Sequence, residues 1–221
     1  MSEAMTQVES ERSVLLLVDI QPDFMPGGAL PVADGDAILE PVDRLMRSGR
    51  FGLQVATQDW HPPDHVSFAS RHPGHQALET IEVHGHEQIL WPDHCVQGTP
   101  GAALHPELDW RPVSVVVRKA LDATADTYSG FRNNVDAAGR RRSTGLAGLL
   151  RERGVERVYI CGLARDVCVR WTVVDALEAG FATALFWDLS RSVDPAGDAQ
   201  LRAALQDQGA AILKFGDIDV D

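Results

Sequence analysis

The stretch "SVLLLVDI" at residues 13–20 carries five consecutive apolar residues in front of an aspartate. Apolar residues that run without alternation are typical of a strand buried on both faces of a parallel sheet. Comparable runs recur along the chain: "FGLQVAT" (51–57), "VSVVVRKA" (113–120), "RVYICGL" (157–163), "ATALFWDL" (182–189) and the shorter "AAILKF" (210–215). The sequence therefore predicts six strands of this buried kind.

Segments with apolar residues three and four apart separate these runs, and each ends at a glycine. They are "DAILEPVDRLMRSG" (36–49), "STGLAGLLRERG" (143–154), "DVCVRWTVVDALEAG" (166–180) and "AGDAQLRAALQDQG" (196–209). We expect Asp166 to cap the third of these helices. Strands that alternate with helices predict an α/β fold, namely a three-layer sandwich whose mainly parallel six-stranded sheet has helices on both faces.

Length and composition set broad limits on the function. A chain of 221 residues suits one domain, and we expect residues 1–12 to be a disordered lead-in to a single domain over 13–221. A formal net charge of -12 argues against nucleic acid and membrane as partners. The polar N-terminus does not resemble a secretory signal, and three cysteines are typical of a reducing compartment, so a cytoplasmic location is expected.

An irregular insertion at about 59–112 interrupts the alternation and holds all eight histidines. Within it, Asp59 and His61 form a D-x-H pair, and His94 could supply a third ligand. One carboxylate with two imidazoles suits zinc, iron or manganese. His65 is a fourth candidate, and composition alone leaves open four of the other histidines, at 72, 75, 84 and 86.

Ionisable side chains stand where four predicted strands end. Asp19, Asp59 and Lys119 end three of them, and the loop after the fourth delivers Cys168. Ligands of open parallel sheets bind beyond the carboxyl ends of the strands. At a helix start and near Lys119, the Cys168 thiolate would be favoured, and Asp19 could accept the thiol proton. The alternative is that Cys168 is only a small apolar residue at a helix start.

The other two cysteines differ from Cys168. Cys161 lies inside a predicted strand, where burial makes a thiol inert. Cys95 follows His94 and is ambiguous. Cys161 and Cys168 lack C-x-x-C spacing, so a structural zinc knuckle is not expected.

Several stretches together resemble the nicotinamidases (pyrazinamidases) of the isochorismatase-like cysteine hydrolases. They are "VDIQPDFMPGGAL", "TQDWHPPDHVSFAS", "WPDHCVQGTPGAALHPEL", "RKALDATADTYSGF" and "GLARDVCVRWTVVDAL". The resemblance runs from about residue 13 to 215. It implies hydrolysis of nicotinamide, and of pyrazinamide, to the acid and ammonia through a cysteine thioester in NAD salvage.

The resemblance also implies roles for individual residues. Asp19, Lys119 and Cys168 would form the catalytic triad. Asp59, His61 and His94 would bind one divalent metal, zinc before iron or manganese, with His65 near it. A cis peptide would join Leu163 to Ala164, and backbone N–H groups of Ala164 and Cys168 would form the oxyanion hole. The substrate ring would lie among Phe24, Trp91 and Tyr128.

Two features depart from the family pattern. Arg165 and Val167 replace the outer residues of the usual threonine–aspartate–tyrosine segment before the nucleophile, and Pro22 stands before Asp23. Three alternatives stay open at this point: a metal-free amidase of the same superfamily, a non-catalytic α/β binding module, and a metal-dependent hydrolase in which Cys168 takes no part. A small-molecule substrate and a possible homo-oligomer complete the expectations.

Overall fold

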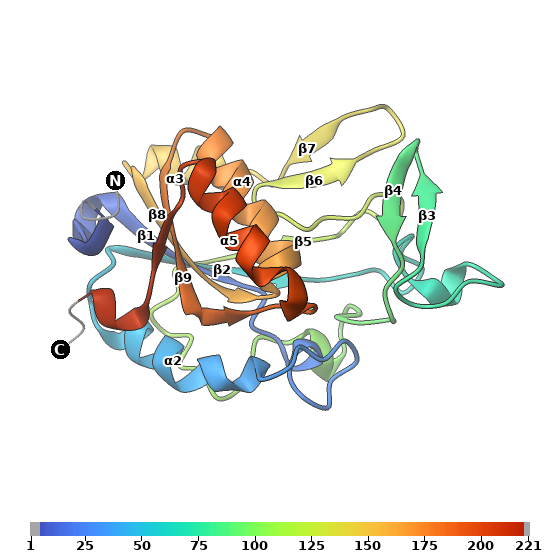
Figure 1. Ribbon diagram of the computed structural model, residues 1–221, viewed down its shortest axis with the longest axis horizontal. Coiled ribbons are helices and arrows are strands. Elements are labelled where there is room, and N and C mark those ends of the chain that lie inside the picture. Colours follow the sequence, from blue (N-terminus) through green and yellow to red (C-terminus); the bar gives the residue numbers. More distant parts are fainter. Residues whose placement is uncertain (1–4, 219–221) are drawn as a thin grey trace.

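A six-stranded sheet forms the centre of the computed structural model, which describes residues 5–218 (Figure 1). All five pairings between its neighbouring strands are parallel. In spatial order the strands are β10 (Ala211–Leu213), β9 (Ala182–Arg191), β8 (Arg157–Leu163), β1 (Ser13–Val18), β2 (Leu53–Asp59) and β5 (Val115–Lys119). The predicted α/β class, strand number and parallel arrangement are confirmed.

Helices cover both faces of this sheet. In Figure 1, one face carries α2 (Leu39–Arg47), and the other carries α3 (Leu146–Glu152), α4 (Arg170–Glu178) and α5 (Asp198–Asp207). Alternate residues of β1 pack into two separate cores: Leu15 and Leu17 into the core with α2, Val14 and Leu16 into the core with α3 and α4. A strand between two apolar layers cannot alternate with polar residues, which explains the continuous run at 14–18. Within residues 5–218, none of the helices has the length and apolar character needed to cross a membrane.

Strand β5 does not match the expected burial on both faces. It is the last strand of the sheet in spatial order, and Val116 is 44% exposed. Half-buried and exposed residues of β5 alternate up to Lys119, which is buried. An unbroken apolar run therefore does not distinguish this edge strand from a central one.

The insertion at 59–112 contains regular structure that its sequence did not indicate. Strands β3 (Thr80–Val83) and β4 (His86–Ile89) form an antiparallel hairpin. A second hairpin, β6 (Arg132–Val135) with β7 (Arg141–Ser143), follows β5. Both hairpins lie at the end of the molecule away from the chain termini (Figure 1). Their strands are short and polar, so they lack an apolar pattern.

Short helical turns complete the described chain. They are η1 (Ser10–Arg12), η2 (Pro22–Phe24), η3 (Gly35–Ile38), η4 (Ala69–Arg71), η5 (Pro100–Ala102), the π-helical turn η6 (Arg165–Val169), η7 (Pro195–Gly197) and η8 (Phe215–Asp217). Turn η3 leads directly into α2, so the predicted helix at 36–49 is a 3-10 turn followed by an α-helix.

The expected disordered lead-in is packed against the domain over its described part. Met5 is buried, and the Tyr159 hydroxyl donates to its carbonyl oxygen at 3.0 Å. Glu9 forms an ion pair with Arg157 at 2.8 Å. These contacts hold residues 5–12 against β8, whereas residues 1–4 of the predicted lead-in lie outside the described residues.

Candidate active site

Four charged or nucleophilic side chains meet at the carboxyl ends of adjacent strands. Asp19 directly follows β1, and Asp59 of β2 is paired in register with Lys119 of β5. The Lys119 Nζ atom lies 2.9 Å from Asp19 Oδ2, 2.9 Å from Asp59 Oδ1 and 3.5 Å from Cys168 Sγ. It also donates to the Thr127 carbonyl oxygen at 3.0 Å. One buried ammonium therefore joins two carboxylates and the thiol.

Asp19 is held in a fixed orientation by β2. The Thr57 hydroxyl donates to Asp19 Oδ1 at 2.6 Å, and the Asp19 N–H donates to Thr57 Oγ1 at 3.2 Å. Complete burial raises the Asp19 pKa, and the nearby Asp59 adds to this, against the opposing charge of Lys119. A carboxylate with a raised pKa is a better proton acceptor, which is the role expected of Asp19. The sequence did not indicate Thr57 as a site residue, because it belongs to the apolar run at 51–57.

Cys168 lies in η6, between β8 and α4, and is 6% exposed. Burial raises its pKa well above the ordinary value despite the attraction of Lys119, and Asp19 and Asp59 raise it further. Burial and the two carboxylates thus oppose the expected thiolate, whereas Lys119 favours it.

Asp166 does not cap a helix as predicted. The chain forms the π-helical turn before α4 begins at Arg170, so Asp166 lies within a turn and not in front of a helix. Its two carboxylate oxygens accept from the N–H groups of Val193 and Asp194, each at 2.9 Å. Asp166 thus ties the turn to the segment after β9.

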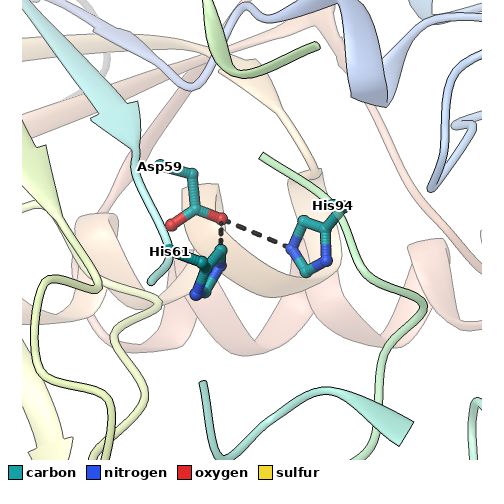
Figure 2. Close-up of side chains that lie close together, drawn as sticks. All are labelled: Asp59, His61 and His94. Carbon is teal, nitrogen blue, oxygen red and sulfur yellow. Dashed lines mark hydrogen bonds and ion pairs between the residues drawn. The ribbon is translucent and has the colours of Figure 1, made fainter. Parts of the chain in front are cut away.

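Asp59, His61 and His94 gather beside Lys119 and could hold a metal ion (Figure 2). Asp59 Oδ2 lies 3.0 Å from His61 Nε2 and 3.5 Å from His94 Nε2. The three groups are buried, and although burial raises the Asp59 pKa, His61 and Lys119 together hold it well below the ordinary value. Asp59 therefore offers an anionic carboxylate that could serve as a ligand.

The residues present fit a bound cation. His94 Nδ1 donates to the Pro92 carbonyl oxygen at 2.7 Å, which leaves a lone pair on Nε2 in neutral histidine. That lone pair faces the Asp59 carboxylate, an arrangement that is stable only with a proton or a cation between them. The oxygen and nitrogen donors suit a divalent transition metal.

His65 lies beside this group, as the sequence suggested. Its ring centroid is 4.2 Å from that of His61, and His61, His65 and Asp126 form a second set of potential ligands. Burial lowers the His65 pKa to about 4. The remaining candidates lie elsewhere: His72 bonds the Val66 carbonyl oxygen, and His75, His84 and His86 are exposed.

The three predicted aromatic residues line one cavity together with Cys168 and the metal-ligand candidates. Phe24, Trp91 and Tyr128 surround a space of about 20 Å³, which is room for about one water molecule. A wider hollow of about 1120 Å³ beside β5 contains no acidic, histidine or cysteine side chain, so volume alone does not mark the site.

The sequence did not single out Gln88, which donates to the Tyr128 hydroxyl at 3.2 Å, or Asp126, which lines the cavity. Gln88 of β4 donates to Asp126 Oδ2 at 2.8 Å, and Asp126 Oδ1 accepts from the Thr127 N–H at 2.7 Å. Trp91 Nε1 donates to the Tyr128 hydroxyl at 3.3 Å. The short hairpin β3–β4 thus brings Gln88 to the cavity, a contact for which the sequence held no signal.

The loop between β8 and Cys168 has the backbone that the resemblance implied. The Leu163–Ala164 peptide is cis, and Ala164 lines the cavity with Cys168.

Cys161 lies within β8 and is fully buried, and burial alone raises its pKa. Cys95 is also buried, and its N–H donates to Asp23 Oδ2 at 2.7 Å.

Fold and site together describe a parallel α/β protein with a buried cysteine, lysine and aspartate beside a metal-binding group. Residues 13–215 match the isochorismatase domain family, and the chain belongs to that family.

Among its members, this chain is 44% identical over 192 residues to a nicotinamidase of Acinetobacter baylyi, covering 87% of each chain. The solved structure of PnC1 from L. infantum in complex with nicotinate matches with a TM-score of 0.85 and 39% identity over 97% of this chain and 98% of that chain. The pyrazinamidase of Pyrococcus horikoshii in complex with zinc matches with a TM-score of 0.75 and 38% identity, over 92% of this chain and 99% of that one.

Proposed function

We propose that this protein is a nicotinamidase, which hydrolyses the carboxamide of nicotinamide to nicotinate and ammonia in NAD salvage and also accepts pyrazinamide. The observation that carries the proposal is the Lys119 ammonium, which touches Asp19, Asp59 and Cys168 at one cavity. The names of the relatives and the nicotinate complex of one of them support the substrate.

The metal-binding group would position the substrate. Asp59, His61 and His94 would hold one divalent ion, and zinc is expected because a similar pyrazinamidase was solved with zinc. When bound, the ion would supply a Lewis acid for the ring nitrogen. Phe24, Trp91 and Tyr128 would contact the ring faces and edges and hold the carboxamide near Cys168.

Asp19, Lys119 and Cys168 would carry out acyl transfer in two steps, formation of a thioester and its hydrolysis. Asp19 takes the proton from Cys168 Sγ as the sulfur bonds to the carboxamide carbon, and Lys119 stabilises the separated charges. Backbone N–H groups of Ala164 and Cys168 would stabilise the oxyanion, and removing one such donor typically costs about 3–4 kcal/mol. Asp19 returns the proton to the departing ammonia. It then deprotonates the water that hydrolyses the thioester, and the thiol is restored.

Ammonia release from nicotinamide tests this proposal directly. The purified protein with added Zn²⁺ is expected to form ammonia and nicotinate in equal amounts. Cys168→Ala and His61→Ala should both lose activity, whereas His86→Ala, in the same insertion but exposed, should keep it. A wild-type protein that releases no ammonia would overturn the nicotinamidase proposal. A Cys168→Ala protein near the wild-type rate would instead indicate a metal-dependent hydrolase without a cysteine nucleophile.

The setting of the activity is also part of the proposal. We infer that residues 13–221 act as one hydrolase domain in the cytoplasm, because all three cysteines are free and such thiols are typical of a reducing compartment. Self-association stays a prediction, which light scattering on the purified protein would test.

A further inference from the structure

We propose that Arg165 is a positioning residue that holds the nucleophile turn, residues 164–169, against β9 and the start of α5. The inference rests on the proposed function, because it assigns a role in placing Cys168. Arg165 is one of the two residues by which this chain departs from the family pattern before the nucleophile. The structure shows what its guanidinium contacts.

The guanidinium of Arg165 is buried and fully engaged. Its Nε atom donates to Ser190 Oγ at 3.0 Å, and Nη2 donates to the carbonyl oxygens of Trp187, at 2.7 Å, and of Ser190. Nη1 pairs with the Asp198 carboxylate. The guanidinium also lies over the Trp187 ring, 4.1 Å from its centroid. Arg165 is only 5% exposed, whereas the Asp198 side chain is 25% exposed.

The pairing of β8 with β9 is irregular beside the Arg165 side chain. Ile160 of β8 pairs with Leu185 of β9, but Gly162 pairs with Ser190, so β8 advances two residues while β9 advances five. Trp187 lies in the extra part of β9, to which the register assigns no β8 partner, and its carbonyl oxygen accepts from Arg165. The planar guanidinium offers five N–H groups in a fixed geometry, which a lysine ammonium cannot reproduce.

The nucleophile turn is compact, so the position of Arg165 determines the position of Cys168. The Ala164 carbonyl oxygen accepts from the N–H groups of Val167, at 3.1 Å, and Val169, at 3.0 Å, so the turn is a compact unit. Ala164, Val167 and Cys168 all line the cavity. Fixing Arg165 therefore fixes Cys168 Sγ relative to Lys119 and Asp19. A misplacement of about 1 Å at a reacting group can reduce a rate by about 100-fold.

Asp198 at the start of α5 is the second half of this contact. Besides pairing with Arg165, it accepts a hydrogen bond from the Ser192 hydroxyl at 2.5 Å. Arg165 and Asp198 thus connect the turn, the segment after β9 and α5. Asp198→Asn would remove the charge while leaving the side chain nearly unchanged in size. It should therefore weaken the contact with Arg165 without creating a cavity.

The test compares Arg165→Lys, Arg165→Met and Asp198→Asn with the wild type. Arg202→Ala is the matched control, because Arg202 also lies over the Trp187 ring, at 5.6 Å, but stands on α5 outside the turn. For nicotinamide hydrolysis well below the unfolding temperature, Arg165→Lys should lower kcat about 10- to 100-fold with KM within about threefold. Arg165→Met should lower kcat further, and Asp198→Asn less.

A second measurement separates positioning from general destabilisation. Iodoacetamide labelling of each cysteine, located by mass spectrometry, should become at least about fivefold faster at Cys168 in the Arg165 variants, because release of the turn exposes a buried thiol. Cys161, within β8, should remain unlabelled and serves as an internal control. This readout needs no substrate, so it stands even if the wild type fails to hydrolyse nicotinamide.

Specific outcomes would overturn the inference. One is a kcat within twofold of the wild type in both Arg165 variants; another is labelling of Cys161 that rises in parallel with Cys168, which would indicate loss of global stability only. If Arg165→Met does not fold, the kcat values and labelling rates of Arg165→Lys and Asp198→Asn decide the question in the same way.

Discussion

The interior of β1 and the carboxyl ends of the parallel strands are equally buried but are stabilised by different forces. Leu17 of β1 and Asp19 just beyond it are both fully buried, and Lys119 at the end of β5 is 1% exposed. Leu17 packs among apolar side chains, whereas Asp19 and Lys119 depend on each other's charge. Burial alone therefore does not tell how a position responds to substitution.

The two regions should differ in what they tolerate. In the interior, an exchange that keeps volume and polarity costs little. At the strand ends, removal of one member of a charged group leaves the others buried without compensation, which costs about 3–5 kcal/mol. The strand ends should thus be the less tolerant region, although both are inaccessible to water.

Lys119→Met is expected to have the largest effect, although methionine is apolar and of similar length. It would leave Asp19 and Asp59 without their shared ammonium, so the free energy of unfolding should fall by about 3–5 kcal/mol. Nicotinamide hydrolysis should fall at least about 1000-fold, because charge separation between Cys168 and Asp19 loses its support. Urea unfolding and steady-state kinetics measure both effects.

Lys214→Met is the matched control, since Lys214 is the other lysine of the chain and is exposed. It should change neither stability nor activity appreciably. Wild-type stability and activity in Lys119→Met would show that the charged group at the strand ends is not a coupled unit.

Removal of the metal should have the next largest effect. Dialysis against a chelator, or His94→Ala, should lower activity at least about 100-fold, because a bound metal contributes several kcal/mol to catalysis. Added Zn²⁺ should restore the dialysed wild type but not His94→Ala. Metal content and ammonia release are measured on the same samples. Full activity at zero metal content would contradict this part of the proposal.

Cys161→Ala tests the interior of β8 at a residue of the same type as the proposed nucleophile, Cys168. It removes one buried sulfur atom in an apolar layer and should cost about 1 kcal/mol of stability. The kcat for nicotinamide should stay within about twofold, since Cys161 does not line the cavity. Thermal unfolding and kinetics provide the measurements, and a loss of activity comparable to that of Cys168→Ala would refute the assignment of the nucleophile.

The smallest effect is expected at the edge of the sheet. Val116→Thr on β5 should change stability by no more than about 0.5 kcal/mol, because Val116 is 44% exposed. The same exchange at Val14 of β1, which is fully buried, should cost about 1–3 kcal/mol, because its hydroxyl would lie in an apolar layer. Equal effects at the two positions, measured by urea unfolding, would show that β5 is covered in solution.

Much of the site followed from the sequence because parallel strands end at one edge. The polar residues that follow apolar runs, Asp19, Asp59 and Lys119, could be assigned to that edge without knowing any side-chain position. Cys168 was assigned by the same argument from the loop after β8. His94 was a candidate ligand from composition, and the resemblance added the aromatic residues and the cis peptide, which lie in loops and leave no periodic pattern.

Other features depended on contacts between segments far apart in the chain. Asp166 was expected to cap a helix, yet it binds the N–H groups of Val193 and Asp194. Arg165 had no explanation until β9 was seen to advance irregularly against β8. Local sequence cannot show which distant backbone groups will lack partners, so neither role could be predicted from it.

The sequence by itself determined the order of strands and helices, the parallel sheet and the edge at which ionisable groups collect, because these follow from apolar periodicity and chain direction. Only the tertiary structure decided which pKa values are raised or lowered at that edge. Burial raises the pKa values of Cys168 and Asp19, while Lys119 and His61 hold Asp59 as an anion. The physical reason is that a pKa depends on desolvation and on neighbouring charges, and both arise only when distant segments pack together.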